Sequence, residues 1–245
     1  MDRHTFKAYD DELALLRQNI IVMGRLARAQ VEMAVESLSR RDPDKAVVVI
    51  TGDAVVDAHQ NTVNDLTLRL LALRSPVAQD LRIVIGSLKL ASELERIADL
   101  ATNIAKRVLV LMQQPALSSI TGIVHMGNTV IGLFDAAMEA YTQGDEVRAM
   151  EVWESDELVD GQCSALLREL MTYMLEDPRN ISACSHLLFV AKNIERVGDH
   201  ATNIAEVVHY IVTGESIIGS RPKRDTSSCD VTGLDTAPAQ NQGLV

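Results

Sequence analysis

Residues 88–105 read LKLASELERIADLATNIA, and the core of this stretch occurs again at residues 195–205 as ERVGDHATNIA. Apolar residues at positions 90, 94, 97, 101 and 104 have the spacing of the buried stripe of an α-helix. Glu95 and Asp99 are four residues apart, so they share one face of that helix, one turn from each other. Like charges at this spacing destabilise an isolated helix. The repeat therefore predicts a helical protein of two similar halves, each with a cation or a partner for its acidic residues.

The composition favours helix packing over sheet packing. Of the 245 residues, 47% are apolar but only 3% are aromatic, and Ala, Val, Leu, Ile and Met dominate the apolar share. No apolar run reaches the roughly 18 residues of a membrane-spanning helix, and residues 1–7 lack the apolar core of a signal peptide. We therefore expect a soluble, cytoplasmic, all-α protein.

Charge and cysteine content argue against several classes of protein. The net charge of −11 disfavours nucleic acid as a partner, and the short basic cluster at residues 221–224 does not reverse this balance. The cysteines Cys163, Cys184 and Cys229 are odd in number and have no CxxC spacing, so they indicate neither a disulfide framework nor a thiolate zinc site. We expect them to be reduced and to take no part in the function.

The helical periodicity extends over most of the chain and is divided by prolines. The second half repeats the first at an offset of 103 residues, and at an offset of 100 residues for the third helix, because the turn near Asp177-Pro178 is shorter. We predict two tandem three-helix bundles, related by a pseudo-twofold internal repeat, and a flexible polar tail. In the first half the expected helices are residues 11–39, 43–73 and 77–112; the expected domains are residues 1–116 and 117–218, and the tail is 219–245.

A second acidic pair, Asp53 with Asp57, belongs to the second helix of the first half. In an antiparallel helix hairpin, residues equidistant from the turn lie side by side. The midpoint between Asp53 and Asp99 is position 76, and so is the midpoint between Asp57 and Glu95. Because Pro76 stands at that position and breaks the helix, the four carboxylates are predicted to meet.

The second half repeats this arrangement with Asp156 and Asp160. Asp156 with Asp199, and Asp160 with Glu195, both centre on the turn at Asp177-Pro178. The sequence therefore predicts two clusters of four carboxylates, one in each half.

Four carboxylates in one place need a compensating charge. Two of them about 4 Å apart repel by about 4 kcal/mol at an effective dielectric of about 20. A single acidic pair at helical spacing is ordinarily a solvated face, but the doubled convergence favours a bound cation. Arg96 and Arg196 are expected to neutralise part of the charge as ion pairs. An all-oxygen cluster suits iron, manganese or magnesium. The predicted ligands are Asp53, Asp57, Glu95, Asp99, Asp156, Asp160, Glu195 and Asp199.

The rival interpretation is a metal store or oxidase of the ferritin-like kind. Such proteins need a Glu-x-x-His pair on each of two helices, and only Glu206 with His209 fits, without a counterpart in the first half. The sequence contains no Gly-rich phosphate loop, HExxH or nucleophile motif, so we predict no catalytic residue and no organic cofactor. A helical scaffold without metal is the third possibility. His200, beside Asp199, is expected to be structural or exposed.

Residues 95–103 and 195–203 resemble the signature of the PhoU phosphate-signalling family, and the resemblance covers about residues 9–214. It implies two three-helix bundles that, in some members, carry metal clusters on DxxxD and ExxxD pairs, here the eight carboxylates given above. Iron, zinc, manganese and magnesium are the candidate metals. Ala98 departs from the family pattern, which often has Gly there, and the tail at 219–245 has no counterpart in it.

The same resemblance implies a function without catalysis. Members of the family are cytoplasmic, often dimeric, negative regulators that link the phosphate-specific ABC transporter to the sensor histidine kinase controlling phosphate-starvation genes. We accordingly expect an adaptor that contributes to phosphate homeostasis, contacts the transporter on the side of its ATP-binding subunit, and forms a homodimer. It is expected to reach the membrane only through its partners.

Overall fold

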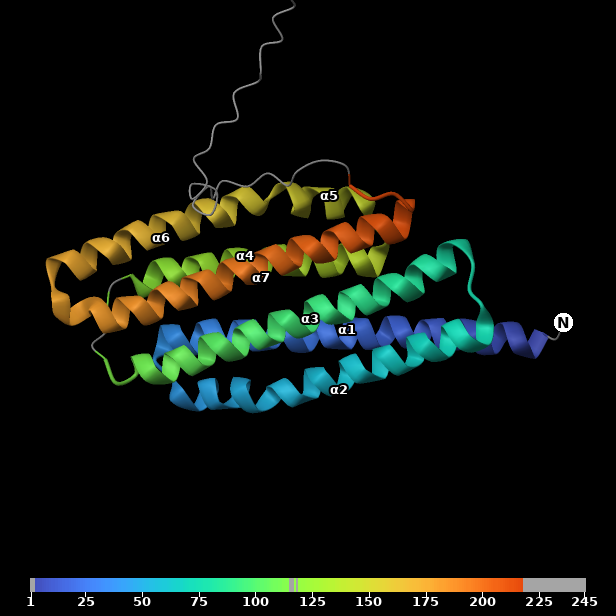
Figure 1. The fold of residues 1–245 in the computed structure, drawn as a ribbon, viewed down its shortest axis with the longest axis horizontal. Coiled ribbons are helices and arrows are strands. Elements are labelled where there is room, and N and C mark those ends of the chain that lie inside the picture. Colours follow the sequence, from blue (N-terminus) through green and yellow to red (C-terminus); the bar gives the residue numbers. More distant parts are fainter. Residues whose placement is uncertain (1–2, 115–116, 118, 218–245) are drawn as a thin grey trace, which may run out of the picture.

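The computed structural model describes residues 3–114, 117 and 119–217, apart from the side chains of residues 3–7 and 156. Within these residues all regular structure is helical, which confirms the predicted fold class. The tail predicted at 219–245 lies outside the described residues. The elements drawn in Figure 1 are α1 (Arg3–Arg40), α2 (Pro43–Arg74), α3 (Ala78–Leu111), α4 (Ile120–Gln143), α5 (Glu146–Glu154), α6 (Asp156–Glu176), the 3-10 turn η1 (Pro178–Asn180) and α7 (Ile181–Thr213).

The helix ends follow local signals in the sequence. The side chain of Asp42 accepts hydrogen bonds from two backbone N–H groups in the first turn of α2, which begins with Pro43. Asp145, at the equivalent place in the second half, caps α5 in the same way. Gly144 and Gly214 end α4 and α7 in the left-handed conformation that glycine adopts without steric cost. The repeat therefore extends to the caps of the helices.

The second half contains one break that the repeat does not predict. Its second helix is divided at Ser155 into α5 and α6, whereas α2 is continuous at the equivalent Gly52. Ser155 Oγ donates a hydrogen bond of 2.7 Å to the carbonyl oxygen of Glu151. Such a bond to the carbonyl four residues earlier competes with the helical hydrogen-bond ladder and bends helices. The expectation of a second half with exactly the helices of the first was therefore wrong at this point.

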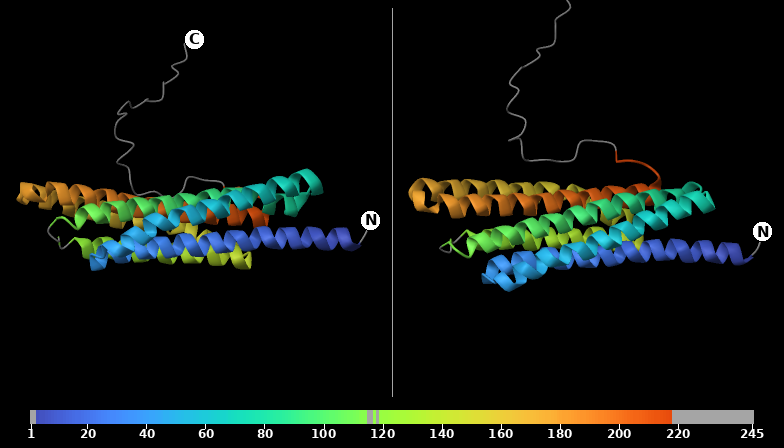
Figure 2. Two further views of the ribbon diagram at one scale, coloured as in Figure 1. Left: turned by 90° about the horizontal axis from the view of Figure 1, so that it is seen from below. Right: turned by 60° about the horizontal axis from the view of Figure 1, so that its bottom comes forward.

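Four helices form the centre of the molecule. α1 packs against α4 and α3 packs against α7, so each half contributes two helices to the contact between halves. Figure 2 shows these pairs as two layers, with α1 and α4 on one side of the molecule and α3 and α7 on the other. α2 covers the outer side of the first half, and α5 and α6 cover the outer side of the second (Figure 1). The domain boundary predicted at residues 116–117 falls between α3 and α4 and stays a prediction.

Two glycines at equivalent positions of the repeat allow α1 and α4 to approach each other. Gly24 lies under the end of the Met138 side chain, and Gly127 lies under both γ-methyl groups of Val35. Each pair is related to the other by the same offset of 103 residues. A Cβ atom at either glycine would overlap the facing side chain. The α1–α4 contact therefore has the pseudo-twofold symmetry of the sequence repeat.

The α3–α7 contact departs from that symmetry. His200 Nδ1 lies 2.7 Å from Glu93 Oε2, and Asn203 donates a hydrogen bond of 2.9 Å to the same oxygen. Leu100 occupies the first-half position equivalent to His200. His200 thus has a structural role, as expected, because it joins the two halves across their contact.

Candidate metal centres

The first acidic cluster lies between α2 and α3, the two helices of a hairpin that turns at Ser75-Pro76. Burial raises the pKa of Asp53, and the negative charges of Asp99 and Asp57 raise it further. Burial likewise raises the pKa of Glu95, with the charges of Asp99, Asp57 and Asp53 adding to the effect. The structure therefore brings these four carboxylates close enough to repel one another, as their shared midpoint predicted.

Positive groups neutralise the first cluster only in part. Arg96 Nε lies 3.8 Å from Glu95 Oε2, but the Arg96 side chain is 62% exposed, where an ion pair contributes little. The Thr102 hydroxyl and the Lys106 ammonium favour the charged form of Asp53 and so oppose the rise in its pKa. Burial and the repulsion between carboxylates outweigh these positive groups, so the pKa of Asp53 and that of Glu95 are both raised.

The second cluster lies between α6 and α7 and is more deeply buried. Asp160 is 4% exposed and Glu195 is 6% exposed, and Asp199 is half-buried. Burial raises the pKa of Glu195, and the negative charges of Asp199 and Asp160 raise it further. These three predicted ligands therefore interact as expected. The fourth, Asp156, has a side chain outside the described residues.

The cation beside the second cluster differs from the one that the sequence suggested. Lys192 Nζ lies 2.6 Å from Glu195 Oε2 and donates a hydrogen bond of 2.8 Å to Oε1, which lowers the pKa of Glu195 against the effect of burial. The expected partner was Arg196, which is exposed. Lys192 was not predicted as the partner of Glu195, because the equivalent residue of the first half is Ser92. The spacing of three residues between Lys192 and Glu195 could have predicted this ion pair, because residues three apart on a helix are neighbours.

The donor set fits a hard or borderline cation, because it consists of carboxylate oxygens. In the side-chain arrangement described for residues 3–114, 117 and 119–217, no three His, Cys, Asp or Glu residues are grouped so that they could hold one ion. The carboxylates would have to turn toward a shared ion, which repulsion opposes as long as no cation is between them. A metal at either cluster thus stays a prediction.

The two residues of the Glu-x-x-His motif, on which the ferritin-like interpretation depends, make contacts outside the carboxylate clusters. Glu206 accepts a hydrogen bond of 2.9 Å from the indole N–H of Trp153, and His209 Nδ1 lies 3.6 Å from Glu146 Oε1. Both contacts join α7 to α5. Neither residue belongs to the carboxylate clusters, so the structure contains no support for a ferritin-like centre at this motif.

Two tandem helical repeats, with carboxylates of α2 and α3 close together in the first and of α6 and α7 in the second, define the class of fold. The PhoU domain family matches residues 20–108 and 123–208, one match in each half. The chain belongs to the PhoU family. No helix in the described part of the chain is long and apolar enough to cross a membrane.

Individual members of the family match nearly the whole chain. A relative from Caulobacter vibrioides strain NA1000, named phosphate-specific transport system accessory protein PhoU homolog, is 46% identical over 93% of this chain and 100% of its own length. A relative of the same name from Xylella fastidiosa strain Temecula1 is 42% identical over 93% of this chain and 94% of its own. The crystal structure of PhoU from Pseudomonas aeruginosa superposes with a TM-score of 0.82 at 35% identity, and covers 84% of this chain and 100% of that one. PhoU from Streptococcus pneumoniae has a TM-score of 0.78 at 29% identity, covering 85% of this chain and 99% of that one.

Neutralising Glu95 should stabilise the protein when it has been freed of cations by chelation. The folded-state pKa of Glu95 is raised above its ordinary value of 4.5, so the folded state binds protons more tightly than the unfolded state. Stability should therefore fall as the pH rises from about 4.5 through the folded pKa, and Glu95→Gln should raise the free energy of unfolding at pH 7 but not below pH ~4.5. Urea unfolding at both pH values measures this.

Glu169→Gln is the matched control, because Glu169 is exposed on α6 and belongs to neither cluster. It should change the free energy of unfolding little at either pH. An equal effect of the two substitutions at pH 7 would show that repulsion within the first cluster is not what Glu95 contributes.

Proposed function

We propose that this protein is a regulatory accessory protein of a phosphate-specific transport system. The observation that carries this proposal is similarity over nearly the full length of both chains, 46% identity over 229 residues, to a relative named as such an accessory protein. Similarity of this extent includes both halves and the contact between them, rather than a single shared domain.

In this proposal the protein acts as an adaptor and not as an enzyme. It binds the phosphate ABC transporter on the side of the ATP-binding subunit, binds the phosphate sensor histidine kinase, and represses phosphate uptake and phosphate-starvation genes when phosphate is plentiful. The pseudo-twofold repeat supports an adaptor, because two similar halves present two similar surfaces to partners. The net charge of −11 suits protein partners better than nucleic acid. The protein works in the cytoplasm and as a homodimer.

We further propose that each carboxylate cluster holds a cation, with iron, zinc, manganese and magnesium as the candidates. The mutual repulsion of Asp53, Asp99 and Glu95, and the burial of Asp160 and Glu195, support this assignment. A bound cation would supply positive charge where the protein supplies too little, and so would join the second and third helices of each half.

Deleting the gene should leave phosphate-starvation genes active in phosphate-rich medium, because the proposed repressor of their sensor kinase is gone. Transcript levels of these genes, measured in rich and in phosphate-poor medium, test this. A copy of the intact gene supplied in trans is the control and should restore repression. Normal repression in the deletion strain, with no second copy of the gene present, would contradict the regulatory role.

A further inference from the structure

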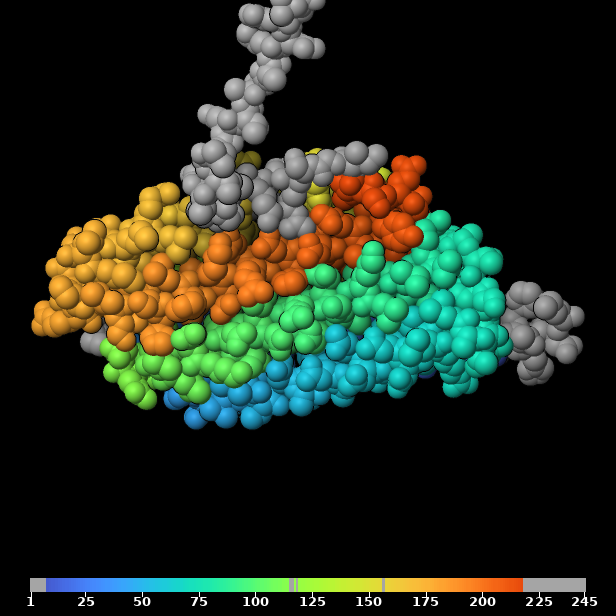
Figure 3. Space-filling view, viewed as in Figure 1, coloured from blue at the N-terminus to red at the C-terminus, as the bar shows by residue number. Residues whose placement is uncertain are grey.

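Four cationic side chains lie along the outer side of the α3–α7 pair. Figure 3 shows these two helices side by side on one face of the molecule, with α2 beyond α3 and α6 beyond α7. Arg96 and Arg107 are eleven residues apart on α3, which places them on one face of that helix. Arg196 shares a face of α7 with Phe189, which contacts Arg107. We call the three arginines and Lys192, one turn before Arg196, the basic strip.

The carboxylates nearest to the basic strip lie at its sides and are more buried than its cations. Glu95 follows about 100° round α3 from Arg96 and interacts with the carboxylates of α2; its side chain is 21% exposed, against 62% for Arg96. Glu195, next to Arg196, is buried toward α6. Glu93, between the two helices, is bonded to two side chains of α7. A partner that approaches this face therefore meets positive charge first.

Two arginines of the basic strip keep their charge unpaired within the described part of the chain. Lys192 and Arg96 each approach a cluster carboxylate, at 2.6 and 3.8 Å respectively. No carboxylate among the described side chains lies within 4 Å of Arg107 or Arg196. Because a guanidinium group stays protonated in proteins, both residues are permanent positive charges that a carboxylate of another molecule can pair with.

Arg107 is held in place by an aromatic side chain rather than by an acidic one. Its guanidinium carbon lies 4.6 Å from the centre of the Phe189 ring, and its Nη1 lies 3.3 Å from His186 Nδ1. An arginine has five N–H donors in a planar fork that matches a carboxylate, and stacking on a ring fixes that plane. Phe189 is itself 54% exposed, so it offers apolar surface directly beside the fork.

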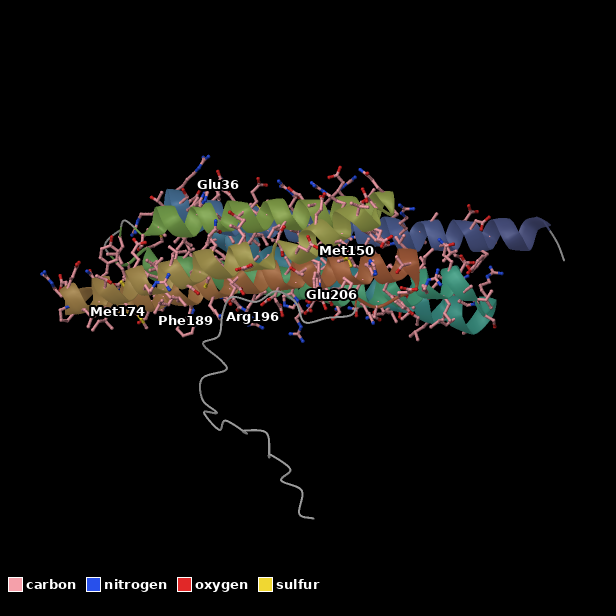
Figure 4. The ribbon with its side chains drawn as sticks, turned by 90° about the horizontal axis from the view of Figure 1, so that it is seen from above. Glu36, Met150, Met174, Phe189, Arg196 and Glu206 are labelled. Atoms are coloured by element: carbon pink, nitrogen blue, oxygen red, sulfur yellow. The ribbon has the colours of Figure 1, made fainter. Side chains whose placement is uncertain are left out.

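The spacing of the two unpaired arginines fits a short acidic segment. Figure 4 shows Phe189 and Arg196 along the same edge of α7. They are two turns apart, so the Arg107 guanidinium on Phe189 is about 10 Å from Arg196 along the helix. Side chains three residues apart in an extended segment are also separated by about 10 Å. Since the chain as a whole has a net charge of −11, an acidic partner is repelled elsewhere and attracted here.

We propose that the basic strip binds an acidic segment of a partner protein. Two carboxylates of that segment pair with Arg107 and Arg196, and an apolar or aromatic side chain between or beside them packs on Phe189. Arg96 and Lys192 add attraction from the border of the site without depending on direct contact. Because α3 and α7 belong to different halves, the bound segment lies across the contact between the halves.

Fluorescence anisotropy with fluorescein-labelled poly-L-glutamate tests the charge requirement, because this probe offers carboxylates at every spacing. At low salt the full-length protein should bind it, and added salt should weaken binding by screening. The double variant R107Q/R196Q should weaken binding about five- to thirtyfold, as expected for the loss of two ion pairs. The control R25Q/R168Q removes the same charge from exposed positions on α1 and α6 and should leave the affinity close to that of wild type.

A copolymer of glutamate and tyrosine tests the aromatic part of the site. Wild-type protein should bind this copolymer more tightly than poly-L-glutamate, because tyrosine adds apolar contact with Phe189. Phe189→Ala should remove the preference while poly-L-glutamate still binds. Circular dichroism melting checks that all variants are folded, which is expected because the substituted side chains are exposed or half-buried.

The proposal would be overturned if poly-L-glutamate did not bind at low salt, or if it bound wild type and R107Q/R196Q equally. Single-stranded DNA and vesicles containing phosphatidylserine are the competing probes. If either bound more tightly than both acidic polypeptides and lost affinity in R107Q/R196Q, the basic strip would belong to that class of partner and the proposal would also fail. These measurements involve neither a transporter nor phosphate-starvation genes, so their failure would leave the proposed function untouched.

Discussion

Chelation of bound cations should lower the melting temperature of the purified protein by about 5–11 °C. A ligand that binds only the folded state stabilises it by about 2.7 kcal/mol when its free concentration is 100 times its dissociation constant. For a chain of this size, 1 kcal/mol corresponds to about 2–4 °C. The physical reason is that a cation between the carboxylates of α2 and α3, or of α6 and α7, replaces repulsion by attraction. Differential scanning calorimetry before and after chelation, with metal then restored, measures the shift.

Single substitutions should divide this effect between the two clusters. Asp99→Asn should weaken metal binding in the first half and Asp199→Asn in the second, so that each variant loses metal mainly from one cluster. Asp65→Asn is the control, because Asp65 is exposed on α2 and lies outside the cluster. Elemental analysis of protein purified without chelator quantifies the metal. The cation sites in both halves would be contradicted if the wild-type protein contained no metal and if chelator did not change its melting temperature.

Replacing Gly127 by Ala should destabilise the protein more than replacing the equivalent Gly24. A Cβ atom at position 127 would lie 2.8 and 2.9 Å from the γ-methyl groups of Val35, a buried β-branched side chain that is stiff in a helix. At position 24 the Cβ would meet the flexible end of Met138, which can move. Overpacking costs about 1–3 kcal/mol, and the gain in helix propensity from Gly to Ala, about 1 kcal/mol, offsets part of it.

Gly132→Ala is the matched control for this pair. Gly132 is also on α4, but a Cβ there has nothing within 4 Å, so the substitution should stabilise the protein by about 1 kcal/mol through helix propensity alone. Urea unfolding should then separate Gly127→Ala from Gly132→Ala by about 1–3 kcal/mol. Equal stabilisation by all three substitutions would mean that the contact between α1 and α4 is looser than the structure describes.

Apart from the break at Ser155, the helices and the hairpin within each half could be predicted because their signals are local. The caps at Asp42 and Asp145 and the breaks at Pro43 and Pro76 act within a few residues of themselves. Once two helices are known to form an antiparallel hairpin, the turn determines which residues face each other. That is why the meeting of Asp53 with Asp99 followed from arithmetic on the sequence. The family, too, followed from residues 95–103 and 195–203.

The burial of the carboxylate clusters and the positive groups beside them were less predictable from the sequence than the helices were. The repeat assigns the same carboxylates to both clusters, yet the second is more deeply buried and has Lys192 beside Glu195. Burial depends on how α6 lies on α7 after the break at Ser155, and Lys192 has no equivalent in the first half. Comparing the two halves of the sequence identifies the residues that they share. It does not identify features present in one half only, such as Lys192.

The sequence by itself determined the helical class, the tandem repeat and the proximity of the four acidic residues in the first hairpin, because helical periodicity and turn position act over short distances along the chain. Only the tertiary structure decided how the two halves meet. Two of the contacts between the halves are the packing of Met138 on Gly24 and the contact of His200 with Glu93. Each joins residues more than 100 positions apart in the sequence. Such contacts depend on the combined shape of four helices in close packing, and no local signal in the chain encodes that shape.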